Sequence, residues 1–216
     1  MKFVSPIIIL TGATDGIARN KSKGKALLEY IKTSNGNAKN VEIWEMDLAD
    51  LQSVKNFAHK FIKEVGELHM LFNNAGYVGG IDIVKTKDGL EQQFQVNHLA
   101  PFLLTLLLLD TMKKSVSIEL PGKIAFTSSG LQRIGLMEIK LMNIIVAKEL
   151  SRVVQNENIK TYALHPGINK TNIKSGADFI SSCIITALTY FIAAPVEQGA
   201  FNTLYSVLPP QNNDTG

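Results

Sequence analysis

The sequence predicts one α/β domain over residues 1–216, built on a doubly wound parallel sheet. Short apolar segments with the composition of strands buried on both faces recur along the chain, and amphipathic helical segments lie between them. Strands that alternate with helices in this way form a parallel sheet covered on both sides. The predicted strands are 7–10, 41–46, 68–73, 123–128 and 159–164.

Helical spacing places helices between these strands. Apolar residues at three- and four-residue steps predict a helix over 51–65, and Asp50 suits its N-cap. A longer helix is predicted from Glu91 to Met112, and Pro101 inside it must kink the helix or interrupt its hydrogen bonds. Shorter helical faces are predicted around 27–31 and over 141–154.

The composition excludes several classes of protein. The chain has 22 Lys and Arg against 19 Asp and Glu, a formal net charge of +3, and 45% of its residues are hydrophobic, which excludes a disordered chain. The sequence has no basic stripe with interleaved aromatic residues, so we predict no nucleic-acid partner. Cys183 is the one cysteine, so neither an intrachain disulfide nor a cysteine-based zinc site can form, and we predict no metal site.

Two apolar segments each leave an alternative open. The stretch 180–195 falls short of the roughly 20 residues that a membrane-spanning helix needs. We expect it to form a core helix or to cover a substrate, with contact to a membrane surface as the second choice. The expected localisation is therefore cytoplasmic, with peripheral membrane association as a variant. The leucine-rich segment 103–109 fits the core or a second subunit of a homodimer, and we favour the core.

Small and polar residues follow several of the predicted strands. The first strand ends in a turn with two glycines, which let a pyrophosphate approach backbone N–H groups. Because ligands of open α/β sheets bind at the carboxyl ends of the strands, these segments predict one site along one edge of the sheet. They are Thr11-Gly12-Ala13-Thr14-Asp15-Gly16-Ile17-Ala18, Asn73-Asn74-Ala75-Gly76, Thr127-Ser128-Ser129 and His165-Pro166-Gly167.

Six blocks of sequence occur in the order found in one enzyme family: TGATDGIA, WEMDLADLQSV, LFNNAG, DGLEQQFQVNHLAPFLLTLLLL, GKIAFTSS and ALHPGINKT. The chain resembles the short-chain dehydrogenase/reductase family, most closely its retinol-dehydrogenase-like branch, over most of its length. The resemblance implies a Rossmann-like fold that binds NADP or NAD. It also implies hydride transfer between that cofactor and a lipophilic alcohol or carbonyl.

The resemblance further implies roles for individual residues. Asn97 would support a proton-relay water, Ser129 would orient and polarise the substrate, and Lys140 would bind the ribose. The implied cofactor contacts are Thr11, Gly12, Asp15, Gly16 and Ile17 in the phosphate turn, Asp47 and Leu48 beside the adenine, Asn74, Ala75 and Gly76 along the nucleotide, and Pro166, Gly167 and Thr171 at the nicotinamide end.

One catalytic residue of the family is absent. The reaction needs a tyrosine four residues before a lysine, because the ammonium lowers the pKa of the phenol that transfers the proton. Lys140 resembles that lysine, but Leu136 stands in the tyrosine's place and cannot transfer a proton. Tyr77, Tyr162 and Tyr190 lack the four-residue relation to Lys140 that aligns two side chains on a helix.

A helix–strand unit is missing as well. Ala18 is followed at once by residues 19–24, which resemble the loop after the family's second strand, and the 30 positions from Thr11 to Asn40 can supply one helix but not two helices and a strand. We expect strand 41–46 to pair beside the first strand or to leave a defect, with an exposed strand edge and a displaced adenine pocket. The family's last strand is expected to be absent too.

Arg19 bears on the choice of cofactor. It resembles the arginine that ends the missing strand, and an arginine there favours a 2′-phosphate, which predicts NADP over NAD.

These observations support three hypotheses about function. The first is an NADP-dependent oxidoreductase acting on a lipophilic alcohol or carbonyl. The second is a catalytically inactive protein that binds a nucleotide or a partner, since Leu136 replaces the tyrosine. The third is a shortened product without a function of its own, which predicts exposed apolar surface and no cooperative unfolding.

Overall fold

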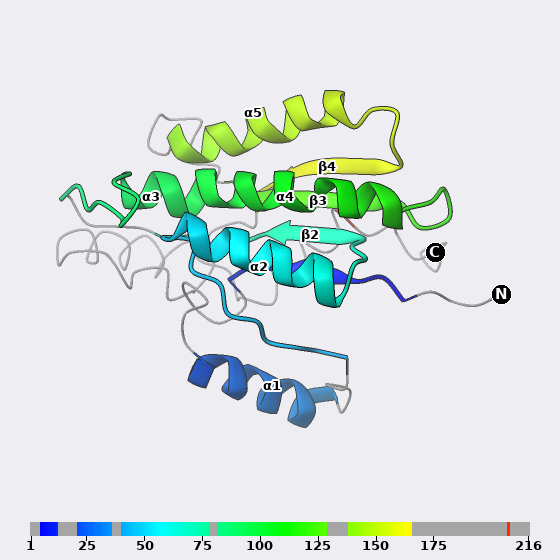
Figure 1. Ribbon diagram of the computed structural model, residues 1–216, viewed down its shortest axis with the longest axis horizontal. Coiled ribbons are helices and arrows are strands. Elements are labelled where there is room, and N and C mark those ends of the chain that lie inside the picture. Colours follow the sequence, from blue (N-terminus) through cyan, green and yellow to red (C-terminus); the bar gives the residue numbers. More distant parts are fainter. Residues whose placement is uncertain are drawn as a thin grey trace, which may run out of the picture.

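The computed structural model describes residues 5–12, 21–35, 40–77, 82–128, 138–165 and 207. Four parallel strands form one sheet in the order β1-β2-β3-β4 (Figure 1). They are β1 (Ile8–Leu10), β2 (Met70–Asn73), β3 (Gly122–Thr127) and β4 (Ile159–Leu164), at four of the predicted positions. Each strand adds on the same side of its predecessor, so they form one half of a doubly wound sheet.

Three helices cover one face of this sheet: α2 (Leu51–Glu64), α4 (Ala100–Ser115) and α5 (Glu138–Val153) (Figure 1). Their buried side chains share one core with Leu71 and Ile124, which lie opposite each other in the β2–β3 register. In segment 103–109, Leu104 and Leu108 are buried in that core, as favoured from the sequence.

The opposite face of the sheet carries a second, smaller apolar cluster. Met70, Phe72 and Ala125 point to this face because side chains alternate along a strand. Leu164 joins them from β4. Among the described residues outside the strands, Val207 is the one that is buried in this cluster.

The segment predicted as strand 41–46 is not a strand. Its residues belong to no ladder, and it packs instead on α2, where the Trp44 ring lies 5.8 Å from Phe57 and 6.0 Å from Phe61 between ring centroids. A strand is defined by its hydrogen-bonded neighbour, and no described strand stands between this segment and β1. Of the two expected outcomes, the described residues therefore show the second: segment 41–46 does not pair beside β1, and the sheet has a defect there.

Residues 21–24 begin a helix, not the loop expected from the sequence. They open α1 (Lys21–Asn35), which lies apart from the sheet, on the β1 side (Figure 1). Since α1 occupies 21–35, no strand forms there, in agreement with the loss of a helix–strand unit.

The outer edge of β1 has no strand beside it among the described residues. The Ile7 carbonyl and the Thr11 N–H bond toward β2, to His69 N at 2.9 Å and Phe72 O at 3.0 Å. Alternate residues of a strand face opposite neighbours, so the backbone groups of Ile8 and Leu10 point to the open edge. Ile8 and Leu10 are 50% and 51% exposed, and among the described residues this edge of the sheet is open, as predicted from the sequence.

The long helix predicted from Glu91 is interrupted before Pro101. It begins as α3 (Gln92–Phe94), continues as the π-helical turn η1 (Gln95–Leu99), and becomes α4 at Ala100. Pro101 has no N–H for the Asn97 carbonyl four residues earlier, so the hydrogen-bond ladder changes register there. The predicted interruption is confirmed, and it places Asn97 inside the π-helical turn.

Asp50 caps α2 as predicted. Its carboxylate accepts the Gln52 N–H at 2.9 Å and forms an ion pair with Lys87. The hydrogen bond from Lys87 is the main reason that the pKa of Asp50 lies below its ordinary value. A lowered pKa means that the charged carboxylate stabilises the fold above the unfolded pKa, and that this contribution is lost as the pH falls through the folded pKa.

We expect Asp50→Asn to keep the cap but lose the ion pair, and Asp50→Ala to lose both. At pH 7 the midpoint of thermal unfolding should fall in the order wild type, Asp50→Asn, Asp50→Ala. The gap between wild type and Asp50→Asn should close as the pH falls through the lowered pKa of Asp50, while the Asp50→Ala deficit persists. A gap that does not depend on pH would show that the ion pair contributes no stability.

Candidate nucleotide-binding site

The carboxyl ends of β1, β2 and β3 are tied together by short polar contacts. The Thr11 hydroxyl, just after β1, accepts the N–H groups of Asn74 and Ala75 at 3.0 Å each and donates to the Phe72 carbonyl at 3.3 Å. From β3, the Thr127 hydroxyl donates to the Asn74 side-chain oxygen at 3.3 Å. These bonds fix the first turn against the end of β2.

Gly12 is glycine for two reasons that the structure makes explicit. Its φ is +74°, a left-handed conformation that L side chains rarely adopt. A Cβ at this position would lie 2.6 Å from the Ala75 Cα, so a side chain cannot fit. Together with Ala75 and Gly76, it leaves a strip of small residues at the strand ends, where a nucleotide can approach the backbone.

The Asn97 side chain binds the loop that follows β2. Its oxygen accepts the Tyr77 N–H and its NH₂ donates to the Tyr77 carbonyl, both at 2.7 Å. Both ends of the amide are therefore engaged with the backbone of one residue. The sequence suggested support of a relay water; the structure gives this side chain the task of holding the Gly76–Tyr77 loop.

Asp47 and Leu48, expected beside the adenine, lie in the turn before α2. The Asp47 carboxylate accepts the Ala49 N–H at 2.9 Å, and the backbone N–H of Asp47 donates to the Ser53 hydroxyl at 2.9 Å. The Leu48 side chain is buried in the core, so its backbone is the part that faces polar groups.

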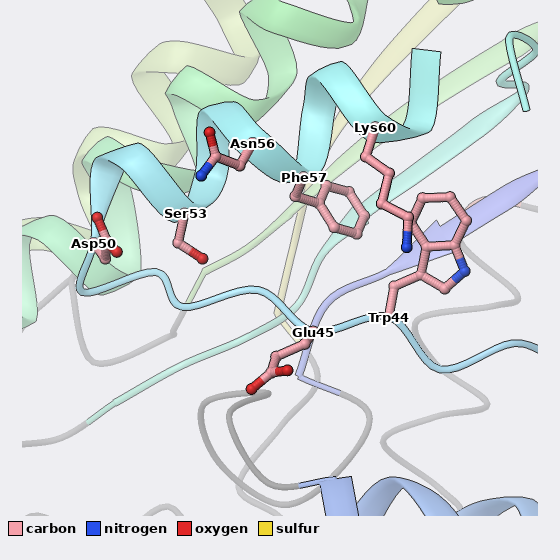
Figure 2. A pocket seen from close by; sticks show the side chains of 7 residues that line it. All are labelled: Trp44, Glu45, Asp50, Ser53, Asn56, Phe57 and Lys60. Carbon is pink, nitrogen blue, oxygen red and sulfur yellow. The ribbon is translucent and has the colours of Figure 1, made fainter. Parts of the chain in front are cut away.

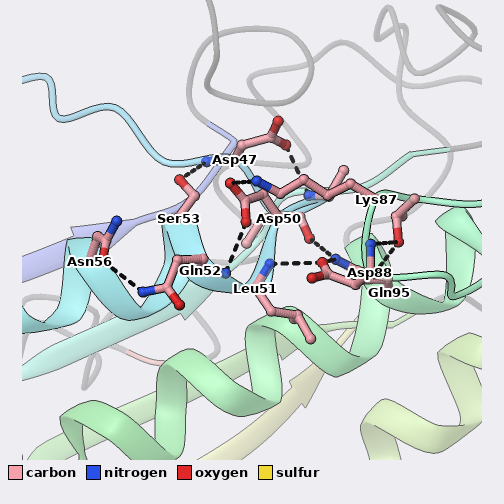
Figure 3. Close-up of polar contacts among 12 residues, drawn as sticks. Asp47, Asp50, Leu51, Gln52, Ser53, Asn56, Lys87, Asp88 and Gln95 are labelled. Carbon is pink, nitrogen blue, oxygen red and sulfur yellow. Dashed lines mark hydrogen bonds and ion pairs between the residues drawn. The ribbon is translucent and has the colours of Figure 1, made fainter.

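A glutamine that sequence reasoning did not single out holds this turn in place (Figure 3). Gln95 is fully buried and donates to the Leu48 carbonyl at 3.3 Å and to Asp88 at 2.7 Å, while its oxygen accepts the Thr86 hydroxyl at 2.6 Å. Asp88 in turn accepts the N–H of Leu51 at 3.0 Å. These bonds join the start of η1 to the start of α2. No local sequence pattern predicts this contact.

A shallow hollow of about 340 Å³ lies where the 44–50 segment meets α2 (Figure 2). The Lys60 ammonium stands 4.4 Å from the centre of the Trp44 ring at one side of it. The lining residues are Trp44, Glu45, Asp50, Ser53, Asn56, Phe57 and Lys60, and none of them is a predicted site residue.

Several predicted site residues lie outside the described ranges: Asp15, Gly16, Ile17, Arg19, Ser129, Pro166, Gly167 and Thr171, as do Leu136, Cys183 and the stretch 180–195. Lys140 is placed in the first turn of α5. In the ranges that are described, no group of His, Cys, Asp and Glu side chains could hold a metal ion, and no helix is long and apolar enough to cross a membrane.

Tyr162 does not substitute for the missing tyrosine. It packs against the Met70–Phe72 cluster on the face of the sheet opposite α5, the helix that carries Lys140. Burial raises the pKa of its phenol, whereas a catalytic tyrosine needs a lowered one.

The comparisons with known proteins agree with this arrangement. A family model described as short chain dehydrogenase matches residues 12–178. Human retinol dehydrogenase 11 is 31% identical over 238 residues, covering 94% of this chain and 72% of that protein. Human retinol dehydrogenase 14 is 35% identical over 190 residues, covering 77% of this chain and 54% of that protein. The NADPH-bound carbonyl reductase from chicken fatty liver superposes with a TM-score of 0.64 at 19% identity, covering 90% and 87% of the two chains.

The chain belongs to the short-chain dehydrogenase family. Within that family it is retinol-dehydrogenase-like, in agreement with the resemblance found in its motifs.

The alignment also measures the shortening. It is 238 positions long, but 94% of the 216 residues is only about 203, so about 35 positions face gaps in this chain. That is the size of a helix, a strand and their connections.

Replacing Gly12 with alanine tests the contact with Ala75. Gly89 is the matched control, because its φ is +78° but a Cβ there meets nothing within 4 Å. We expect Gly89→Ala to cost about 1 kcal/mol of unfolding free energy from backbone strain alone. Gly12→Ala should cost about 3 kcal/mol, since strain and a backbone clash add. Equal losses in chemical denaturation would contradict the close packing of the two strand ends.

Proposed function

We propose that this chain is an NADP(H)-dependent oxidoreductase that acts on a lipophilic alcohol or carbonyl. The observation that carries the proposal is the clamped strip of small residues at the ends of β1 and β2, where Thr11 bonds to Asn74 and Ala75. The names of its relatives support the substrate class, since retinol is a lipophilic alcohol. The NADPH in the carbonyl reductase structure and Arg19 support the cofactor.

The residues present fit a dinucleotide. Gly12 itself has no side chain to meet a pyrophosphate, and the backbone of 74–76 lies beside it with Ala75 buried and Gly76 partly open. A bound nicotinamide would supply the hydride acceptor or donor. The residues of this chain that would hold it are Thr11, Gly12, Asp15, Gly16, Ile17, Arg19, Asp47, Leu48, Asn74, Ala75, Gly76, Lys140, Pro166, Gly167 and Thr171.

Three residues would serve the reacting end of the site. Ser129 would hold the substrate oxygen by a hydrogen bond, and Lys140 would bind ribose hydroxyls and raise the local positive potential. Asn97 would keep the loop after β2 in place through its two bonds to Tyr77. The proton that the family's tyrosine transfers has no donor among these groups, so turnover should be slow unless water supplies it.

A second function is favoured by Leu136. A leucine at the tyrosine position retains a nucleotide site but removes its acid–base group, as expected of a protein that binds a nucleotide or a partner without turnover. The wider assignments rest on the sequence alone: one domain over 1–216, a cytoplasmic location, membrane-surface contact through 180–195, and a homodimer as the alternative use of the leucine-rich helix.

Thermal unfolding with NADPH tests the proposal. A ligand that binds only the native state stabilises it by about 2.7 kcal/mol at a hundredfold excess over Kd. We expect a saturable rise in the unfolding midpoint, larger for NADPH than for NADH. A cooperative transition that neither nucleotide shifts would refute nucleotide binding, and the absence of any cooperative transition would favour the hypothesis of a shortened, non-functional product.

Restoring the missing phenol separates the two functions. If only the acid–base group is lacking, Leu136→Tyr should raise the rate of NADPH-dependent carbonyl reduction at least tenfold, which is about 1.4 kcal/mol of barrier. Leu136→Phe supplies the same ring without the hydroxyl and should leave the rate unchanged. Equal rates in both variants, with NADPH binding intact, would place residue 136 away from the reacting atoms.

A further inference from the structure

Asn143 joins three elements by one buried side-chain amide. It lies on α5, one turn after Lys140, and is 2% exposed. Its NH₂ donates to the Asn97 carbonyl at 3.1 Å and to the Thr127 carbonyl at 3.0 Å. Both donors of the amide are therefore used on backbone oxygens from η1 and from the end of β3.

The acceptor side of the amide is used as well. The Asn143 oxygen lies 2.8 Å from Nδ1 of His98. Since the NH₂ is committed to two carbonyls, this oxygen must accept, and Nδ1 of His98 carries the proton. Three contacts to three backbone or ring atoms fix the amide in one orientation.

The bond to Asn97 lies at the break that the proline makes in the helix. Pro101 has no N–H to give to the Asn97 carbonyl four residues before it, and a buried carbonyl without a donor is costly. Asn143 supplies the donor from another helix. The interruption of the long helix is thus coupled to the position of α5.

These three contacts relate the elements that carry the family's catalytic positions. Asn97 lies in η1, Ser129 follows Thr127 by two residues in the sequence, and Lys140 precedes Asn143 by three residues in α5. We propose that Asn143 is a positioning residue that sets Lys140 against Asn97 and the end of β3. The proposal rests on the proposed function for the role of Lys140, but the bridge itself can be tested without it.

Two variants of matched chemistry test the bridge. Asn143→Leu removes all three contacts and keeps the volume. Thr161→Val is the control, because the Thr161 hydroxyl also bonds to α5, but at the Ala147 carbonyl, 2.7 Å away, and not through Asn143. Amide hydrogen exchange followed by mass spectrometry reports on the segments 95–101 and 122–128 separately.

We expect Asn143→Leu to speed exchange at least tenfold in both segments, while Thr161→Val leaves 95–101 at the wild-type rate. Wild-type exchange in both segments of Asn143→Leu, or the same acceleration in Thr161→Val, would overturn the bridge. This measurement needs no nucleotide, so it stands even if NADPH fails to bind the wild type.

A double-mutant cycle with Lys140 tests positioning as opposed to general stability. If Asn143 acts through Lys140, Asn143→Leu should weaken NADPH binding about tenfold in the wild type and have no further effect in a Lys140→Met background. Additive losses would assign Asn143 a purely structural role. No NADPH binding by the wild type would refute the proposed function and not the bridge.

Discussion

Pro101 imposes the constraint on which the arrangement of the strand ends depends. It removes the N–H that an unbroken helix would give to the Asn97 carbonyl, and the chain responds with a π-helical turn and a donor from α5. The same turn aims the Asn97 side chain at the Tyr77 backbone and the Gln95 side chain at the turn before α2. The π-helical turn before Pro101 therefore contacts the loop after β2, the turn before α2, and α5 at the edge where the site lies.

The two sides of β1 differ in how much of the family's sheet is present. On one side of β1, the strands β2 to β4 and the helices α2, α4 and α5 form a continuous apolar core. On the other side, α1 lies apart from the sheet, and segment 41–46 forms no strand. The half of the sheet that positions Thr11, Asn74 and Asn97 is therefore present, while the half that would flank the adenine from beyond β1 is reduced.

Local signals predicted most of the retained half. Strands β2, β3 and β4 were found from short apolar runs, and Asp50 and Pro101 marked the start of α2 and the break before α4. Segment 41–46 has the same composition but forms no strand, because strand formation depends on a neighbour that composition does not report. The bonds from Asn143 to His98 and from Gln95 to Leu48 were not predicted either, since they join residues 45 and 47 positions apart.

The open edge of β1 has a thermodynamic consequence for the site. Among the described residues, β1 is a three-residue strand paired on one side only, and such a strand frays at a lower free energy than global unfolding requires. The Thr11–Gly12 turn directly follows that strand. Each fraying event therefore breaks the hydrogen bonds of the turn while the α4–β3 core stays folded. Any ligand held by the turn must therefore bind the form in which β1 is paired with β2. Its measured affinity is reduced in proportion to the time that β1 is detached.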